Sequence, residues 1–213
     1  MTTASQLTAS LGARAAVVLL FVFQGAVAAP NLSEIQQQWD IINFQLTGDA
    51  QLESFEQLRA DAETYTDAHP DEVEGWIWRG IIDSSYAGAK GGLGALGLAK
   101  SARKHFDKAI SMNGEAMHGS AYTSLGTLYY SVPGWPIGFG NDAKAAELLQ
   151  QGLSIDPDGM DSNYFYAEFL ARQDQHDEAV RHYRKALDAP PRPGRAVADD
   201  GRRKQIQAAL AAN

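Results

Sequence analysis

The chain has 213 residues, of which 45% are hydrophobic and 21% are charged, and this composition is ordinary for one folded domain rather than for a disordered chain. Its formal net charge is −8 at pH 7, an acidic balance that argues against binding to nucleic acid or to anionic lipid head groups. Cysteine is absent. Disulfide bonds and lipidation of a cysteine are therefore both excluded.

Residues 1–28 differ from the rest and have the pattern of a secretory signal peptide. Arg14 is their only charged residue, an apolar run follows it, and small side chains provide a cleavage site after Ala28. We therefore predict a mature protein of residues 29–213 that is periplasmic or secreted and has no stable membrane anchor. The alternative is that the apolar run is retained as an anchor, for which it is short.

The rest of the chain repeats a helical pattern. No stretch alternates apolar and polar residues as a strand does, whereas a 3.6-residue period recurs throughout. A partial first unit ends at His69-Pro70. The second unit ends at Asn113-Gly114 and has small and aromatic residues spaced as in two packed helices, namely Trp76, Gly80, Ala102, Phe106 and Ala109.

Two later units show the pattern more clearly. The third runs from Ala121 to Pro157 and the fourth ends at Pro191. Small residues at fixed positions let two helix backbones approach, aromatic residues fill the gaps, and proline stops the second helix. A helix over about 198–211 would cap the array. The pattern residues are Tyr122, Leu125, Gly126, Tyr129, Ala145, Leu149 and Gly152, and then Ala167, Leu170, Ala179, Tyr183 and Ala186.

The joint spacing of these residues resembles the tetratricopeptide repeat over residues 31–191. The resemblance implies an all-α fold, a right-handed superhelical stack of antiparallel helical hairpins with a C-terminal capping helix, filling residues 29–213 as one domain. It also implies a protein-protein interaction or assembly module. We expect the partner to be another protein or peptide, or a second copy of the chain.

A narrower resemblance rests on the long inserts, the segment 133–140 and the export signal. These features are similar to the periplasmic T component associated with tripartite ATP-independent (TRAP) transporters. Members of that family are commonly lipoproteins, whereas this sequence has no cysteine to lipidate. The resemblance implies an alternative function, a small-ligand-binding accessory component of a TRAP-type transport system that holds a small organic ligand.

Two segments interrupt the repeat. Residues 86–101 contain a formal dinucleotide fingerprint from Gly92 to Gly97, but no strand precedes it as a phosphate cradle requires, so we interpret it as a flexible or tightly packed glycine-rich insertion. Residues 131–141 should form an ordered loop with buried aromatic residues, either a lid on its own hairpin or part of a ligand site. Both segments lie at the junction between the two helices of a hairpin. We therefore expect them at one edge of the array, where they could border a cleft.

The candidate binding residues are mainly aromatic, because the first helices of a solenoid line its concave face and would present such side chains to a groove. Core packing or a solvated face is the alternative for each. Asp83 is also expected to border the groove. The ligand- or partner-binding candidates are Trp76, Tyr122, Tyr129, Trp135, Phe139, Tyr164 and Glu168.

The sequence gives little support for an enzyme. The five histidines are dispersed and none forms an i, i+3 or i+4 pair, so we predict no metal site. The serines lack the context of a nucleophile elbow. We predict no cofactor and no catalytic residues.

Overall fold

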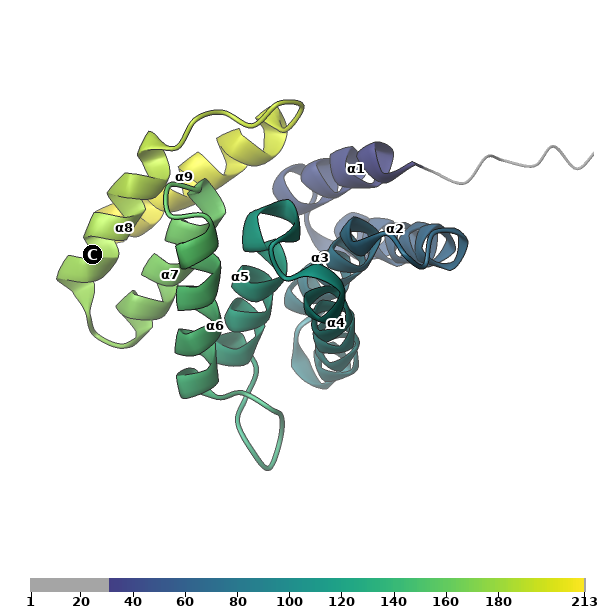
Figure 1. Ribbon diagram of the computed structural model, residues 1–213, viewed down its shortest axis with the longest axis horizontal. Helices are drawn as coiled ribbons and strands as arrows, with labels where there is room; N and C mark the ends of the chain where they lie inside the picture. Colours follow the sequence, from purple (N-terminus) through teal and green to yellow (C-terminus); the bar gives the residue numbers. More distant parts are fainter. Residues whose placement is uncertain (1–30, 213) are drawn as a thin grey trace, which may run out of the picture.

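The computed structural model describes residues 31–212 of the chain. The predicted signal peptide, residues 1–28, lies outside the described residues. Within residues 31–212 the structure contains helices and their connections and no strand (Figure 1). A single isolated bridge pairs Gly134 with Gly140 in this part of the chain.

The nine helices of residues 31–212 form four antiparallel hairpins and a final single helix. The hairpins are α1/α2, α3/α4, α5/α6 and α7/α8, each stacked on the next, and α9 follows. The prediction of an all-α stack of hairpins with a C-terminal capping helix is confirmed. The helix bounds are α1 Leu32–Gln45, α2 Gly48–Ala68, α3 Val73–Lys90, α4 Gly92–Asn113, α5 Ala116–Ser131, α6 Asp142–Ile155, α7 Met160–Arg172, α8 His176–Asp188 and α9 Ala196–Ala212.

Local capping sets where two of these helices begin. At α1 the Asn31 side chain accepts a hydrogen bond from the Glu34 backbone N–H, and the Glu34 carboxylate accepts one from the Asn31 backbone N–H, both at 3.0 Å. At α6 the Asn141 side chain accepts from the Lys144 backbone N–H at 2.9 Å. Each cap satisfies backbone donors that have no partner inside the helix.

Small side chains at the helix contacts hold the hairpins together. A Cβ added at Gly126 would lie 2.7 Å from the Leu149 side chain and 3.2 Å from the Ala145 carbonyl oxygen, so the backbones of α5 and α6 approach too closely for any side chain there. The alanines at the predicted pattern positions have no exposed surface, which confirms their role in the core. They are Ala102, Ala109, Ala121, Ala145, Ala167, Ala179 and Ala186.

The glycine-rich segment 86–101 does not form the insertion that the sequence suggested. Helix α3 continues to Lys90 and α4 begins at Gly92, so Gly91, with φ of 62°, is the only break between them. The extra length is helical, since α3 and α4 have 18 and 22 residues against 13 each in α7 and α8. The prediction was wrong because packing against neighbouring helices outweighs the low intrinsic helix propensity of glycine.

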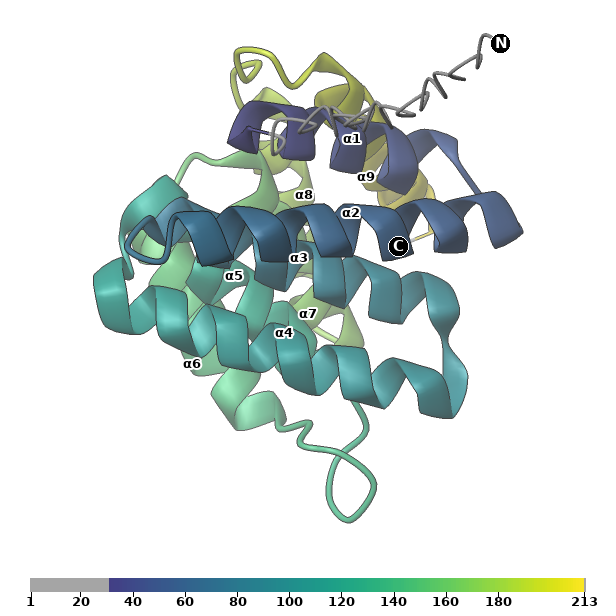
Figure 2. The same cartoon turned by 90° about the vertical axis from the view of Figure 1, so that its right-hand side faces the viewer.

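The second interruption is an ordered loop, as predicted. It joins α5 to α6 and projects beyond the ends of both helices (Figures 1 and 2). Backbone hydrogen bonds from Gly140 to Pro133 and from Ile137 and Gly138 to Gly134 hold its shape. An added Cβ at Gly140 would lie 1.9 Å from the Val132 carbonyl oxygen, so the backbones of the two sides of the loop are in direct contact.

The two ends of the stack meet. Helix α9 packs on α8 and also contacts α1, so residues far apart in the sequence lie side by side (Figure 2). An added Cβ at Gly201 would lie 2.2 Å from the Phe44 ring, which shows how closely α9 approaches α1. None of the helices in residues 31–212 is long and apolar enough to cross a membrane.

The role of backbone contact can be tested with two helical glycines. Gly126→Ala should lower the free energy of unfolding by about 1–3 kcal/mol, because the new methyl group collides with α6. Gly97→Ala in α4 should raise it by about 0.5–1 kcal/mol, because nothing lies within 4 Å of the new Cβ and alanine is the better helix former. Urea unfolding of both variants measures the difference, and equal effects would contradict this account of the packing.

Candidate functional site: a groove closed by the C-terminal helix

A groove of about 1300 Å³ runs along the inner side of the stack. The first helices of all four hairpins line it, as expected for a solenoid, together with the start of α4, the segment before α9, and α9 itself. Aromatic and sulfur-containing residues form its apolar walls. These wall residues are Trp39, Trp78, Met117, Met160, Tyr164 and Phe165.

One part of the groove lining carries hydroxyl groups, and we call this part its floor. Helix α5 places hydroxyl groups along its groove side at helical spacing, and α3 adds Ser84 and Ser85 opposite. Only 2% of the surface of Trp78 is exposed, and its indole N–H has no acceptor among the described residues. The nitrogen itself has no accessible surface, so the unpaired donor lies behind the groove wall and not at its surface. The α5 hydroxyls belong to Ser120, Thr123, Ser124, Thr127 and Ser131.

The backbone is strained where α5 begins, beside the groove. Met117, His118 and Gly119 have φ values of 49°, 56° and 70°, a left-handed turn that interrupts the helix. Such a conformation is uncommon for residues with a side chain and costs about 1–3 kcal/mol each. Met117 and His118 both line the groove. Because strain of this kind clusters at binding and switch sites, its position supports the groove as the functional site.

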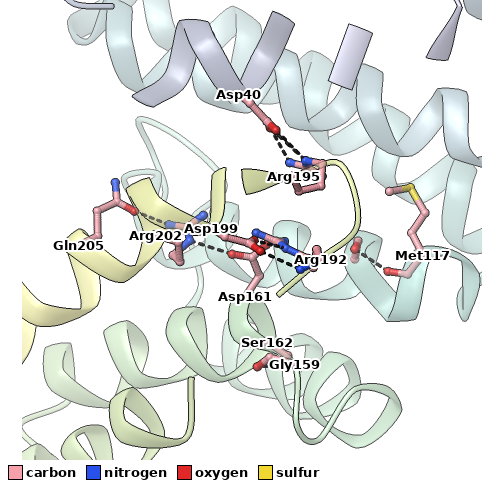
Figure 3. A network of polar contacts seen from close by, with 11 residues as sticks. Asp40, Met117, Gly159, Asp161, Ser162, Arg192, Arg195, Asp199, Arg202 and Gln205 are labelled. Atoms are coloured by element: carbon pink, nitrogen blue, oxygen red, sulfur yellow. Dashed lines mark hydrogen bonds and ion pairs between the residues drawn. The ribbon is translucent and has the colours of Figure 1, made fainter. Parts of the chain in front are cut away.

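A network of ion pairs closes the groove where α9 meets α1 and α7 (Figure 3). The Arg195 guanidinium donates to both carboxylate oxygens of Asp40 on α1, with a shortest distance of 2.7 Å. Asp40 is 2% exposed. The same guanidinium lies 4.9 Å from the centre of the Trp78 ring, so the closing contact also forms part of the groove wall.

Asp161 on α7 is the second centre of this network. Arg202 donates to it at 2.7 Å and Arg192 at 2.5 Å, and Arg192 also bonds Asp199 at 2.7 Å. Burial alone would raise the pKa of Asp161, but Arg202 and Arg192 outweigh it and hold that pKa well below its usual range. Every arginine that lines the groove is therefore already paired with a carboxylate, and the groove does not present a free cation to an anionic ligand.

A separate buried cluster lies around Asp83, away from the groove. Arg59 of α2 donates to Asp83 at 2.7 Å, and Nε2 of His105 on α4 lies 3.4 Å from the other carboxylate oxygen. Ser101 Oγ approaches the same Nε2 at 3.2 Å. A serine-histidine-aspartate relay needs its serine and carboxylate on opposite ring nitrogens, so this cluster lacks that geometry. It joins α2, α3 and α4, and Asp83 does not border the groove as we expected.

The two aromatic residues of the loop between α5 and α6 differ in their exposure to solvent. Phe139 packs against Tyr129 at 5.4 Å between ring centres, under the Arg103 guanidinium. Trp135 is 90% exposed at the tip of the loop, and Ile137 is 62% exposed. The expectation of burial is therefore met in part by Phe139, which is half-buried. It was wrong for Trp135, because the crowded backbone of the loop directs its tip away from the hairpin.

The two interrupting segments do meet at one end of the groove. Gly91, Gly92, Ala95 and Leu96 from the start of α4 line it, together with Val132, Pro133 and Ile137 from the loop. An added Cβ at Gly138 would lie 3.4 Å from the Leu96 side chain. We call the uncharged surface formed by Ala95, Leu96, Val132, Pro133 and Ile137 the groove mouth.

Of the seven candidate binding residues, the structure brings only Tyr164 into the groove. Trp76 donates its indole N–H to the Pro70 carbonyl, Tyr122 packs over Gly114, and Glu168 accepts a hydrogen bond from the Tyr183 hydroxyl. Tyr129 and Phe139 pack on each other, and Trp135 projects into solvent. A binding role for these six residues would need a surface other than the groove.

Sequence reasoning missed most of the groove residues. Trp76 and Trp78 are two positions apart on one helix and so point about 160° apart, since each residue turns by about 100°, and Trp78 is the one that faces inward. The arginines of the network are visible in the sequence as a basic C-terminal cluster, but the sequence does not give their carboxylate partners, which lie as far away as 155 residues. Helical phase is the signal that separates Trp78 from Trp76.

No group of three or more histidine, aspartate or glutamate side chains in residues 31–212 is arranged to hold a metal ion. The fingerprint from Gly92 to Gly97 lies at the start of α4, after the helix α3 rather than after a strand. It therefore lacks the strand-turn-helix context of a dinucleotide site.

Comparison with known proteins agrees with the geometry. The tetratricopeptide-repeat family model matches residues 161–193, which contain α7 and α8. Among solved structures, the chain is similar to a thermophilic tetratricopeptide-repeat protein of Thermus thermophilus, with 19% identity, a TM-score of 0.54, and coverage of 76% of this chain and 90% of that chain. No curated protein matches the sequence.

The protein therefore has the fold of a helical-repeat solenoid, and residues 161–193 match the model of the tetratricopeptide repeat. The resemblance predicted from the spacing of small and aromatic residues is confirmed at this level. The narrower resemblance to a transporter T component is not confirmed and stays a prediction.

Closure of the stack should depend on the buried ion pair between Asp40 of α1 and Arg195, which lies just before α9. Asp40→Asn leaves Arg195 without its charge partner and should lower the free energy of unfolding by about 3 kcal/mol. It should also raise hydrogen exchange in α9. Asp200→Asn, which removes a surface pair with Lys204 on α9, should cost about 1 kcal/mol or less. Unchanged exchange in α9 of the Asp40 variant would contradict closure by this pair.

Acid should weaken the Asp83 cluster. Burial alone would raise the pKa of Asp83, but His105, Ser101 and Arg59 stabilise the carboxylate and lower that pKa below 3.8. Because the pKa is lower in the folded than in the unfolded chain, this stabilisation is full above about pH 4 and is lost as the pH falls through the folded value. In urea unfolding, Asp83→Asn should be less stable than the wild type at pH 6, and the difference should shrink at pH 3. The exposed Asp71→Asn should match the wild type at both pH values, and a constant difference for Asp83→Asn would refute the assignment.

Proposed function

We propose that the protein is a non-catalytic binding module, exported from the cytoplasm, whose groove holds an extended segment of a partner polypeptide. The groove of about 1300 Å³ is the observation that carries this proposal. Pockets for single drug-sized ligands usually measure about 300–1000 Å³. A longer occupant that follows the inner helices toward α9 fits this volume better.

The chemistry of the groove suits a polypeptide. Aromatic walls accept apolar side chains, and hydroxyl groups can bond the carbonyl groups of an extended backbone. The lining arginines are neutralised by Asp40, Asp161 and Asp199. Of the other lining carboxylates, Asp158 pairs with Lys185 and burial raises the pKa of Asp156, so charge has a small part in selection. We therefore expect an occupant that is mainly uncharged and apolar.

Support for export comes from the sequence of residues 1–28, which has the pattern of a cleaved signal peptide. The absence of cysteine from the whole chain suits an oxidising compartment such as the periplasm. Fusion of residues 1–40 to a reporter that is active only outside the cytoplasm would test this part of the proposal, with residues 31–40 alone as the control.

One observation favours a second candidate function, in which the protein binds a small organic ligand as an accessory component of a TRAP-type transport system. The contact of α9 with α1 joins the ends of the stack, and a groove closed in this way can surround a small molecule more completely than an open solenoid can. The resemblance of segment 133–140 to a transporter T component points the same way. Native mass spectrometry of the mature protein separates the two candidates, since a bound small molecule supports only the second.

The groove itself can be tested by filling it. Ser124 lies on the floor, on the groove side of α5, and Ser124→Trp should abolish binding of peptides selected by the wild-type protein from a random display library. Ser154→Trp makes the same change at an exposed position on α6 and should leave the dissociation constant within about twofold. Isothermal titration calorimetry gives both values. Equal binding by the two variants would show that the peptides bind elsewhere.

A further inference from the structure

The tip of the loop between α5 and α6 is an apolar knob held in a fixed position. Trp135 and Ile137 are the most exposed large hydrophobic residues of the described chain, at 90% and 62%. The three backbone hydrogen bonds of the loop and the packing of Phe139 on Tyr129 hold its base. A held apolar tip loses little conformational entropy when it binds, and this is a property of binding anchors.

The tip and the groove mouth lie next to each other on the same chain. Ile137 belongs to both, because it flanks Trp135 in the loop and also lines the groove beside Leu96 and Val132. A two-fold axis beside this point would bring the tip of each copy to the mouth of the other. This is the geometry of an isologous dimer, in which one surface supplies both the knob and the hole.

Charge favours a second copy at this point. Residues 131–140 contain no charged side chain, and neither do Ala95 and Leu96 on the other side of the mouth. Each copy has a formal net charge of −8, so two copies repel each other over most of their surfaces. Because the tips and mouths themselves contain no charged side chain, contact between them reduces the main cost of bringing these copies together.

We propose that two copies of the chain form a two-fold dimer in which Trp135 of each copy inserts into the groove mouth of the other. A buried aromatic side chain covers about 150–250 Å², so two tips and their mouths form an interface at the small end of the known range, below about 1200 Å². The dimer is weak, with a dissociation constant in the micromolar range. The contact does not depend on what occupies the rest of the groove.

Sedimentation velocity of the mature chain over a range of concentrations tests the dimer. The wild type shifts from monomer to dimer, and Trp135→Ser raises the dissociation constant by at least about thirtyfold, the effect of losing one interface anchor. Ile41→Ser, which replaces a hydrophobic residue of α1 that is 45% exposed, leaves it unchanged. A wild-type chain that stays monomeric at millimolar concentration would overturn the proposal, as would equal effects of the two variants.

The position of the hole is tested separately. Ala95→Glu places a charge in the groove mouth and leaves the tip intact, so it also dissociates the dimer. Mixing the Ala95→Glu chain with the Trp135→Ser chain restores one of the two knob contacts, and a mixed dimer forms more readily than either variant pairs with itself. A wild-type dimer that survives Ala95→Glu would overturn the arrangement. Binding of monomers to phosphatidylcholine vesicles, lost in Trp135→Ser, would instead assign the tip to a membrane.

Discussion

The close approach of paired helices through alanine and glycine is the constraint on which the rest of the structure depends. Where α5 and α6 meet, Gly126 leaves no room for even one methyl group, and alanines with no exposed surface play the same part in the other hairpins. In each hairpin the second helix packs on one side of the first helix and leaves its inner side uncovered. Stacking brings four such inner sides together, and they line the groove.

Closure of the stack converts that concave face into a bounded site. Asp40 on α1 and Arg195 before α9 form a bidentate pair across 155 residues, and Asp161 holds Arg192 and Arg202 from the same C-terminal region. The network uses its arginines for structure and so leaves the groove without a free arginine. Selection of an occupant then depends on shape, aromatic contact and hydrogen bonds from hydroxyl groups.

The chain has two apolar features with different tasks. The groove is concave and follows the inner helices, whereas the loop between α5 and α6 projects beyond its own hairpin (Figure 1) and carries the 90% exposed Trp135. A single exposed tryptophan is ordinary on a protein surface, but a tip held by crowded backbone beside an uncharged mouth is suited to a specific contact. Partner binding in the groove and pairing of copies at its mouth can therefore be separated by mutation.

The sequence alone determined the hairpins, because their signal is local: small residues recur at helical spacing within about 40 positions, as Gly126 and Ala145 show, and prolines such as Pro157 end the second helices. It also located the loop at 131–141. Only the tertiary structure decided which side chains face the groove. Trp78 rather than Trp76 lines it because of helix phase, the glycine-rich segment became helix because neighbours pack on it, and Asp40 meets Arg195 because the whole stack curves back on itself. Such contacts depend on the packing of many elements at once, so no single stretch of sequence predicts them.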